Sequence, residues 1–311
     1  MVAIPDKAKQ FLFAMVKVLI VAAAFYFIYD RLSHTRLDWK QVQHLLENPK
    51  ATYLLIGVVI LAVLNRFFEI LKWRNLVMSI RDISLFEATR QVMASLTAGI
   101  FTPNGVGEYA GKALFYEKSL AKKIVFLNLI CNGAQMMHTL IFGVFGLLYF
   151  NTKHAIIDSQ VILFLFIGCC VGFVALLFMK RFSIKGYSIE KLLHKINTLP
   201  RNIHLKNMGL AFFRYVFFSH QQYLLLVCFG VKLPYLMVLS TIAISYLLAS
   251  SLPSFQFFDF AVKGSVAVFF FGQLGVNEWI VIFVTTAIWF LNVVVPVGIG
   301  SYFVLRFKPL P

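Results

Sequence analysis

Long apolar runs constrain this chain more than any other feature. Several of them approach the roughly 20 residues that a helix needs to cross the hydrocarbon core of a bilayer. Hydrophobic residues make up 60% of the 311 residues, and charged residues make up only 14%. Only helices and closed barrels satisfy their backbone polar groups inside lipid. The sequence therefore predicts an all-α polytopic membrane protein, with one integral membrane domain over residues 1–311.

Six of the apolar runs are predicted to cross the membrane. They lie at about 11–29, 52–73, 124–150, 161–179, 208–229 and 279–305. The first is interpreted as an uncleaved anchor, because no small-residue cleavage site follows Ala24. The domain then divides into an anchor helix with a polar loop (1–51), a first repeat (52–179), a basic cytoplasmic loop (180–207) and a second repeat (208–311).

Two stretches broken by proline or glycine interrupt the apolar pattern. The first is Phe101-Thr-Pro-Asn-Gly-Val-Gly-Glu-Tyr-Ala-Gly-Lys112, and the second runs from Pro253 to Gly264. Both carry charged residues, which are costly at membrane depth and usually functional there. We expect each stretch, with the helix before it, to form a re-entrant hairpin that enters the membrane and returns. The predicted fold is thus about six transmembrane helices plus two broken-helix hairpins.

The two broken stretches share a pattern that indicates a repeat. Glu108-Tyr-Ala-Gly-Lys-Ala113 and Asp259-Phe-Ala-Val-Lys-Gly264 both read acid, aromatic, alanine, any residue, lysine, small residue. Each follows a proline and an intramembrane arginine, Arg66 or Arg214, and corresponding positions lie 148 to 151 residues apart. Three predicted spans separate the starts of the repeats, so the repeats would be inverted. Inverted repeats with broken helices are typical of alternating-access transporters.

Loop charge predicts the orientation. With the amino terminus in the cytoplasm, eighteen Lys/Arg residues, Lys72 among them, fall inside and six fall outside. This positive-inside bias places both termini in the cytoplasm. The bacterial-type inner membrane is part of the overall interpretation, together with the family resemblance given below. The net charge of +16 then belongs to loops and does not indicate a nucleic-acid partner. If residues 236–252 cross the membrane, both the span count and the symmetry change.

A polar stripe follows one face of the predicted span at 124–150. Asn128, Asn132, Gln135 and His138 are spaced by four, three and three residues, which puts them on one side of a helix. Such a face is expensive against lipid, so it must look into protein or water. Two interpretations stay open: the stripe lines a cavity, or it holds the helix bundle together by hydrogen bonds.

Three local charge pairs suggest a path for a charged substrate. Glu108 with Lys112, and Asp259 with Lys263, lie four residues apart, which favours ion pairs on one helical face. These pairs either neutralise themselves at depth or exchange their carboxylates for an anionic headgroup. Arg66 and Glu69, three residues apart, are either a third such pair or part of the path.

The glycines of the first broken stretch suggest a second way to hold an anion. Gly105 and Gly107 let the backbone turn sharply after Pro103. A half-helix that starts there would point free N–H groups and a positive dipole end at a lipid phosphate. The candidate substrate-path residues are Arg66, Glu69, Pro103, Gly105, Gly107, Glu108, Lys112, Asn128, Asn132, Gln135, His138, Arg214, Asp259 and Lys263.

Catalytic, metal and cofactor motifs are not recognised in the sequence. The histidines have no metal-ligand spacing, and no nucleotide-binding loop occurs. The four cysteines lie in apolar runs without ligand spacing, so buried thiols are expected at Cys131, Cys169, Cys170 and Cys228. The sequence predicts no enzyme activity, no metal and no cofactor.

The motif Pro103-x-x-x-Gly107-Glu108, followed by a basic residue and paired with a second broken region near the carboxyl end, resembles the lysylphosphatidylglycerol synthase transmembrane-region family. The resemblance covers roughly residues 65–301. The family includes the flippase half of the bacterial multiple peptide resistance factor. Two departures are Phe255, Phe257 and Phe258 in place of glycines near the second acid, and the expected lack of a soluble aminoacyl-transferase domain.

Residues and resemblance together predict a flippase-like translocase for an anionic phospholipid or another lipid-linked phosphate. The expected partners are membrane lipids, and a homo-oligomer is left open. One alternative is an intramembrane enzyme or accessory subunit that acts on a lipid-linked substrate, with Glu108 or Asp259 as general base. A further alternative is a structural membrane partner without a substrate.

Overall fold

The computed structural model describes Met15 and residues 49–100, 102–103, 105–155, 158, 160, 183–184, 187–188, 196, 198–252 and 259–307. The predicted spans at 11–29 and 161–179, and most of the basic loop, lie outside the described residues.

The described chain is helical apart from one small hairpin, which confirms the predicted class. Its helices are α3 (Pro49–Val77), α4 (Leu85–Gly99), α5 (Val106–Ala113), α6 (Ala121–His154), α9 (Arg201–Cys228), α10 (Tyr235–Ser251), α11 (Asp259–Gln273), α12 (Glu278–Trp289) and α13 (Val295–Leu305). A π-helical segment, η2 (Phe290–Val294), joins α12 to α13. Strands β1 (Ser183–Ile184) and β2 (Tyr187–Ser188) pair antiparallel.

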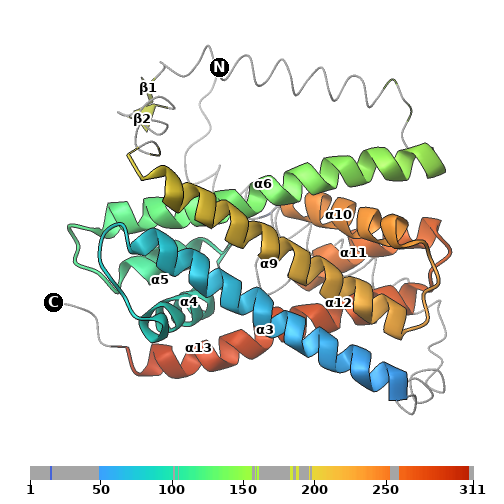
Figure 1. The fold of residues 1–311 in the computed structure, drawn as a ribbon, viewed down its shortest axis with the longest axis horizontal. Helices are drawn as coiled ribbons and strands as arrows, with labels where there is room; N and C mark the ends of the chain where they lie inside the picture. Colours follow the sequence, from blue (N-terminus) through green and yellow to red (C-terminus); the bar gives the residue numbers. More distant parts are fainter. Residues whose placement is uncertain are drawn as a thin grey trace.

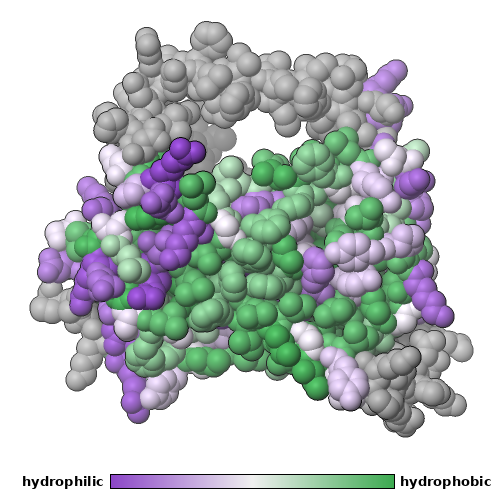
Figure 2. Space-filling view, in the orientation of Figure 1, coloured by the Kyte–Doolittle hydropathy of each residue, from purple (hydrophilic) through white to green (hydrophobic). Residues whose placement is uncertain are grey.

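Three described helical stretches are long and apolar enough to cross a membrane: Ala51–Val77, Ala121–His154 and Glu278–Leu305. Helix α10 is apolar but shorter. Figure 2 shows hydrophobic side chains over most of the middle of one face, with hydrophilic ones gathered toward its left and right ends. These features confirm a membrane protein; the number of spans and the re-entrant hairpins stay predictions.

Helices α3 and α9 pack against each other along their length and run in opposite directions (Figure 1). Near one end of the pair, Asn75 Nδ2 donates to the carbonyl of Ile203 at 2.9 Å. Near the other end, the Cys228 thiol lies 4.0 Å from the carbonyl of Ala51. This antiparallel pair is the spine on which the other helices are arranged.

The helices next to the two broken regions lie toward opposite ends of the spine. Helices α4 and α5 are at the left in Figure 1, where they share an apolar core with Trp73, Val92 and Leu127. Helices α10 and α11 are toward the right, where Val58 and Ile242 belong to a second core. Crosswise contacts complete the bundle, because α4 packs on α13 and α10 packs on α6.

Glycine makes the turn between α4 and α5 possible. Helix α4 begins after Ser84, whose hydroxyl accepts the Glu87 N–H, and α5 begins after Gly105, which has φ 67°. That left-handed conformation strains most side chains but not glycine. A Cβ at Gly107 would lie 2.6 Å from the Ala98 carbonyl oxygen, so only glycine lets α5 approach α4 this closely.

The predicted span at 279–305 is not a regular helix. Pro296 has no N–H and therefore cannot donate to the Asn292 carbonyl four residues earlier. The backbone widens into η2 just before this proline. Arg66 Nη2 donates to the Asn292 carbonyl instead, so the irregularity connects α3 with the last helical stretch. Such π-bulges often occur at functional sites.

Candidate functional site

A cavity of about 320 Å³ lies inside the described bundle, and both broken regions contribute to its lining. Gly105 and Glu108 come from the first, and Asp259 and Lys263 from the second. Helices α3, α6, α9, α10 and α12 supply most of the remaining lining residues. Segments about 150 residues apart in the sequence therefore meet around one polar space, which makes this cavity the candidate site.

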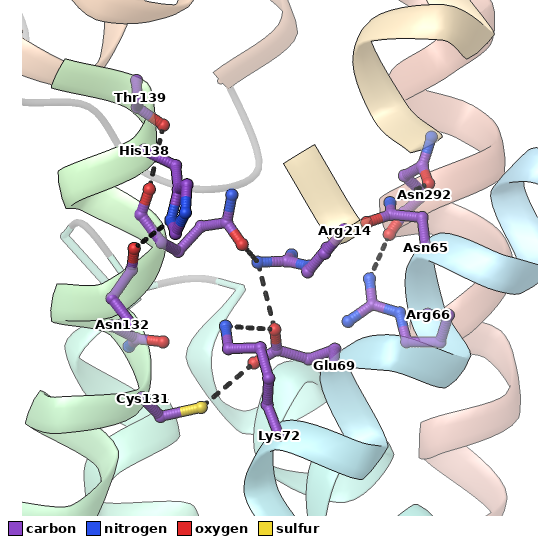
Figure 3. A network of polar contacts seen from close by, with 12 residues as sticks. Asn65, Arg66, Glu69, Lys72, Cys131, Asn132, His138, Thr139, Arg214 and Asn292 are labelled. Carbon is purple, nitrogen blue, oxygen red and sulfur yellow. Dashed lines mark hydrogen bonds and ion pairs between the residues drawn. The ribbon is translucent and has the colours of Figure 1, made fainter. Parts of the chain in front are cut away.

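A carboxylate with two cationic partners lies at one wall of the cavity. Glu69 Oε2 is 3.1 Å from Lys72 Nζ and 3.0 Å from Arg214 Nη1 (Figure 3). The Cys131 thiol donates to Glu69 Oε1 at 3.8 Å. Glu69 is 5% exposed and Lys72 is 0% exposed, so bulk water screens the attraction between these two residues only weakly. Lys72, which is counted above among the cytoplasmic charges, lies in α3 and is an ion-pair partner of this buried acid.

Arg66 does not form the predicted local pair with Glu69. Its Nη2 donates to the Asn292 carbonyl, while Asn65 Nδ2 donates to Asn292 Oδ1 at 2.6 Å (Figure 3). Asn292 Nδ2 in turn donates to Gln221 Oε1 at 2.8 Å. Arg66, Asn65 and Asn292 all line the cavity, so this amide network fixes one arginine at its wall.

Part of the polar stripe of α6 lines the cavity, and part forms hydrogen bonds elsewhere in the bundle. Asn132 and Gln135 line the cavity, and Gln135 Oε1 accepts a hydrogen bond from Arg214 Nη1 at 3.3 Å. Asn128 and His138 do not line it. His138 Nδ1 lies 2.8 Å from the carbonyl oxygen of Ala134, one turn earlier in the same helix.

Lys112 faces the bundle and not the cavity. Its Nζ donates to Asn128 Oδ1 at 2.6 Å and lies 4.5 Å from the centre of a Trp73 ring. The side chain is 1% exposed. The predicted Glu108–Lys112 ion pair is therefore wrong. Lys112 holds α5 against α3 and α6, because its amide and cation–π contacts reach both helices.

Replacement of Lys112 by methionine is expected to lower the free energy of unfolding by about 1–2 kcal/mol, because Asn128 would be left with an unsatisfied buried acceptor. Thermal unfolding in detergent would measure the effect. Lys122→Met, at an exposed position of the neighbouring helix, is the matched control and should leave stability nearly unchanged. Equal melting temperatures for both variants would contradict this structural role.

Asp259 and Lys263 do form their predicted ion pair. Asp259 is the first residue of α11, and both side chains line the cavity. Lys263 Nζ also lies 5.6 Å from the centre of the Tyr246 ring. The Lys263 side chain is 36% exposed, so this pair is far more accessible than the cluster at Glu69.

The amino end of α5 offers fewer free N–H groups than the sequence suggests. Val106 N–H donates to the Pro103 carbonyl at 3.1 Å, Gly107 N–H to Thr102 Oγ1 at 2.8 Å, and Glu108 N–H to the Gly105 carbonyl at 2.9 Å. The expectation of a free half-helix end for a phosphate is wrong for these three groups. Pro103 and Gly107 shape the break and do not line the cavity.

Several cavity residues are not among the sequence candidates. Asn65, Gln222, Ser245, Tyr246 and Asn292 line the cavity, and only their position as polar residues within apolar runs could have indicated them. The described residues contain no group of three or more His, Cys, Asp or Glu side chains that could hold a metal ion.

Comparison with known proteins gives one family match. The model of the family described as the lysylphosphatidylglycerol synthase TM region matches residues 14–257. The matched segment starts earlier than the resemblance drawn from the motifs, contains Arg66, Glu108 and Arg214, and ends two residues before Asp259. Searches among curated proteins and among solved structures found no match. Because the match covers well over half of the chain, this protein belongs to the lysylphosphatidylglycerol synthase transmembrane-region family.

Proposed function

We propose that this protein is a flippase-like translocase that moves an anionic phospholipid, or another lipid-linked phosphate, between leaflets by alternating access. Its partners are then membrane lipids, and it catalyses no covalent step. The observation that carries the proposal is the single cavity that both broken regions line together with Arg66 and Arg214. Family membership supports a role in lipid metabolism or translocation.

An inverted repeat is part of the proposal. Helices α3 to α6 and the later series from α9 to α13 follow the same order, and their first members run antiparallel. The last helix of each series packs on the second helix of the other, α6 on α10 and α13 on α4. Both contacts use glycine at close approach, at Gly146 and Gly300. Two structurally related halves around one cavity suit alternating access.

Re-entrant hairpins are also proposed, from helix length. Helix α4 has 15 residues and α5 has 8, so they extend about 22 Å and about 12 Å. Both are shorter than the roughly 30 Å hydrocarbon core. A pair that enters and returns fits these lengths, as does the position of the pair at one end of the spine. With six crossings, both termini lie in the cytoplasm of a cell with a bacterial-type inner membrane.

Replacement of Lys263 by methionine tests the proposal without a large effect on folding. The variant is expected to slow lipid movement roughly ten- to a hundredfold, because a charged donor near a phosphate contributes about 1.5–3 kcal/mol. Its half-exposed ion pair with Asp259 should contribute less than about 1 kcal/mol to stability. The measurement is the movement of a labelled phosphatidylglycerol between leaflets of proteoliposomes, followed by leaflet-specific quenching.

Lys232→Met removes an exposed lysine away from the cavity and is the matched control. It should move lipid at the wild-type rate. The proposal is wrong for this lipid if wild-type proteoliposomes and protein-free liposomes show the same rate. Loss of turnover of a lipid-linked substrate in Glu108→Ala, with lipid movement unchanged, would support the enzyme alternative.

A further inference from the structure

Among the described residues that line the cavity, one buried acceptor, Asn65 Oδ1, has no hydrogen-bond partner. The buried donors Arg66 Nε, Arg214 Nε and Gln135 Nε2 also have none. A buried donor without a partner costs about 1–3 kcal/mol, and protein interiors rarely leave several together. The three donors belong to residues that line one cavity, which indicates a ligand that accepts hydrogen bonds.

One terminal nitrogen of each guanidinium already has a partner. Arg66 uses Nη2 for the Asn292 carbonyl, and Arg214 uses Nη1 for Glu69 Oε2 and Gln135 Oε1. Because an arginine can only donate, the atom of Gln135 that faces Arg214 must be its oxygen. The amide nitrogen of Gln135 is therefore the atom without a hydrogen-bond partner.

The charges on the cavity wall balance. Its cations are Arg66, Arg214 and Lys263, and its carboxylates are Glu69, Glu108 and Asp259. Glu69 is also paired with Lys72, a buried cation that does not line the cavity, so its charge is compensated from outside the cavity as well. The guanidinium N–H groups of Arg66 and Arg214 can form charge-assisted hydrogen bonds with an anion.

The cavity volume indicates the size of the group that this conformation can hold. About 320 Å³ is at the lower end of the roughly 300–1,000 Å³ of small-molecule sites. It can hold a phosphate with a small polar substituent. The acyl chains of a diacyl lipid would have to stay outside, among the apolar side chains of the membrane-facing surface.

We infer that Arg66, Arg214 and Gln135 form one central binding site for a phosphate group. The inference rests on the proposed function in taking the cavity as the path of the headgroup, and it names the group that is recognised. All three residues belong to the long helices α3, α9 and α6 and none to the broken regions. The anion would therefore stay on a fixed spine while α4–α5 and α10–α11 open the cavity in turn.

Gln135→Glu is the most direct test. The new carboxylate can still accept from Arg214, so the fold is preserved, but it removes a donor and repels an anion. Isothermal titration of the detergent-solubilised protein with inorganic phosphate should show saturable binding to the wild type, weakened roughly ten- to a hundredfold in the variant. Gln273→Glu makes the same change at an exposed position outside the cavity and should bind like the wild type. Arg66→Lys keeps the charge, loses Nε, and should also bind more weakly.

A second set of titrations identifies the source of the phosphate. Competition between inorganic phosphate and short-chain phosphatidylglycerol, with none from the matching diacylglycerol, would support a lipid headgroup. Phosphate binding without competition from the lipid would support the anion site with free phosphate as its ligand. If neither ligand binds the wild type, or if Gln135→Glu binds both unchanged, the inference is overturned.

The two proposals fail in different ways. Lipid movement in proteoliposomes without any phosphate binding overturns the anion site and leaves the translocase intact. Phosphate binding that depends on Gln135, without lipid movement, overturns the translocase and supports the anion site.

Discussion

Replacement of Glu69 by leucine is expected to destabilise the folded protein by about 3–5 kcal/mol, the usual cost of removing one partner from a buried ion pair. Lys72, which is fully buried, and Arg214 would then remain charged without a carboxylate between them. The Cys131 thiol would also lose its acceptor. The expected result is a much lower melting temperature in detergent and a smaller yield of monodisperse protein.

A second variant separates charge from volume at this position, and a variant at an exposed carboxylate is the control. Glu69→Gln keeps an acceptor of the same size, so its loss of stability should be clearly smaller than that of the leucine variant. Glu117→Leu removes an exposed carboxylate from the loop before α6 and should change stability by less than about 0.5 kcal/mol. If the Glu69→Leu variant had the same melting temperature as the wild type, the cluster would contribute nothing to the stability of the fold.

Local features of the structure could be predicted from the sequence because they depend on neighbours in the chain. Run length and composition predict the membrane class. Proline and glycine predict the break between α4 and α5. Asp259 and Lys263 are one helical turn apart, so their ion pair needs no knowledge of the other helices.

The rest of the site depends on which helices are neighbours in space. Glu69 meets Arg214 only because α3 and α9 pack antiparallel. The spacing of Arg66 and Glu69 in the sequence gives no indication that Glu69 pairs with Arg214 instead. Lys112 has a carboxylate one turn away yet bonds to Asn128 on the next helix. A buried lysine can thus be stabilised by a side-chain amide and an aromatic ring on adjacent helices, without an ion pair to the acid one turn away.

This difference changes where recognition is expected. The sequence places anion binding at the start of α5 and at four cations, which are Lys112, Lys263, Arg66 and Arg214. In the structure, Lys112 donates to Asn128, and three N–H groups of the first turn of α5 have hydrogen-bond partners. The spare donors are on α3, α9 and α6. In the proposed mechanism, the breaks are the parts that move, and the three inferred binding groups are held by the spine.

If α4 must fit closely against α13, Gly300→Ala should destabilise the protein by about 3 kcal/mol, the upper end of the usual cost of overpacking. A Cβ there would collide with the Met93 carbonyl and the Thr97 hydroxyl, and Thr97 itself donates to the Val297 carbonyl at 3.1 Å. Backbone on both helices leaves little room to adjust. Gly298→Ala, two residues earlier in α13, meets no described atom within 4 Å and should be neutral or stabilising by up to about 1 kcal/mol, since alanine favours helix over glycine. Opposite shifts of the melting temperature are therefore expected from the same substitution two residues apart, and equal shifts would rule out a close contact at Gly300.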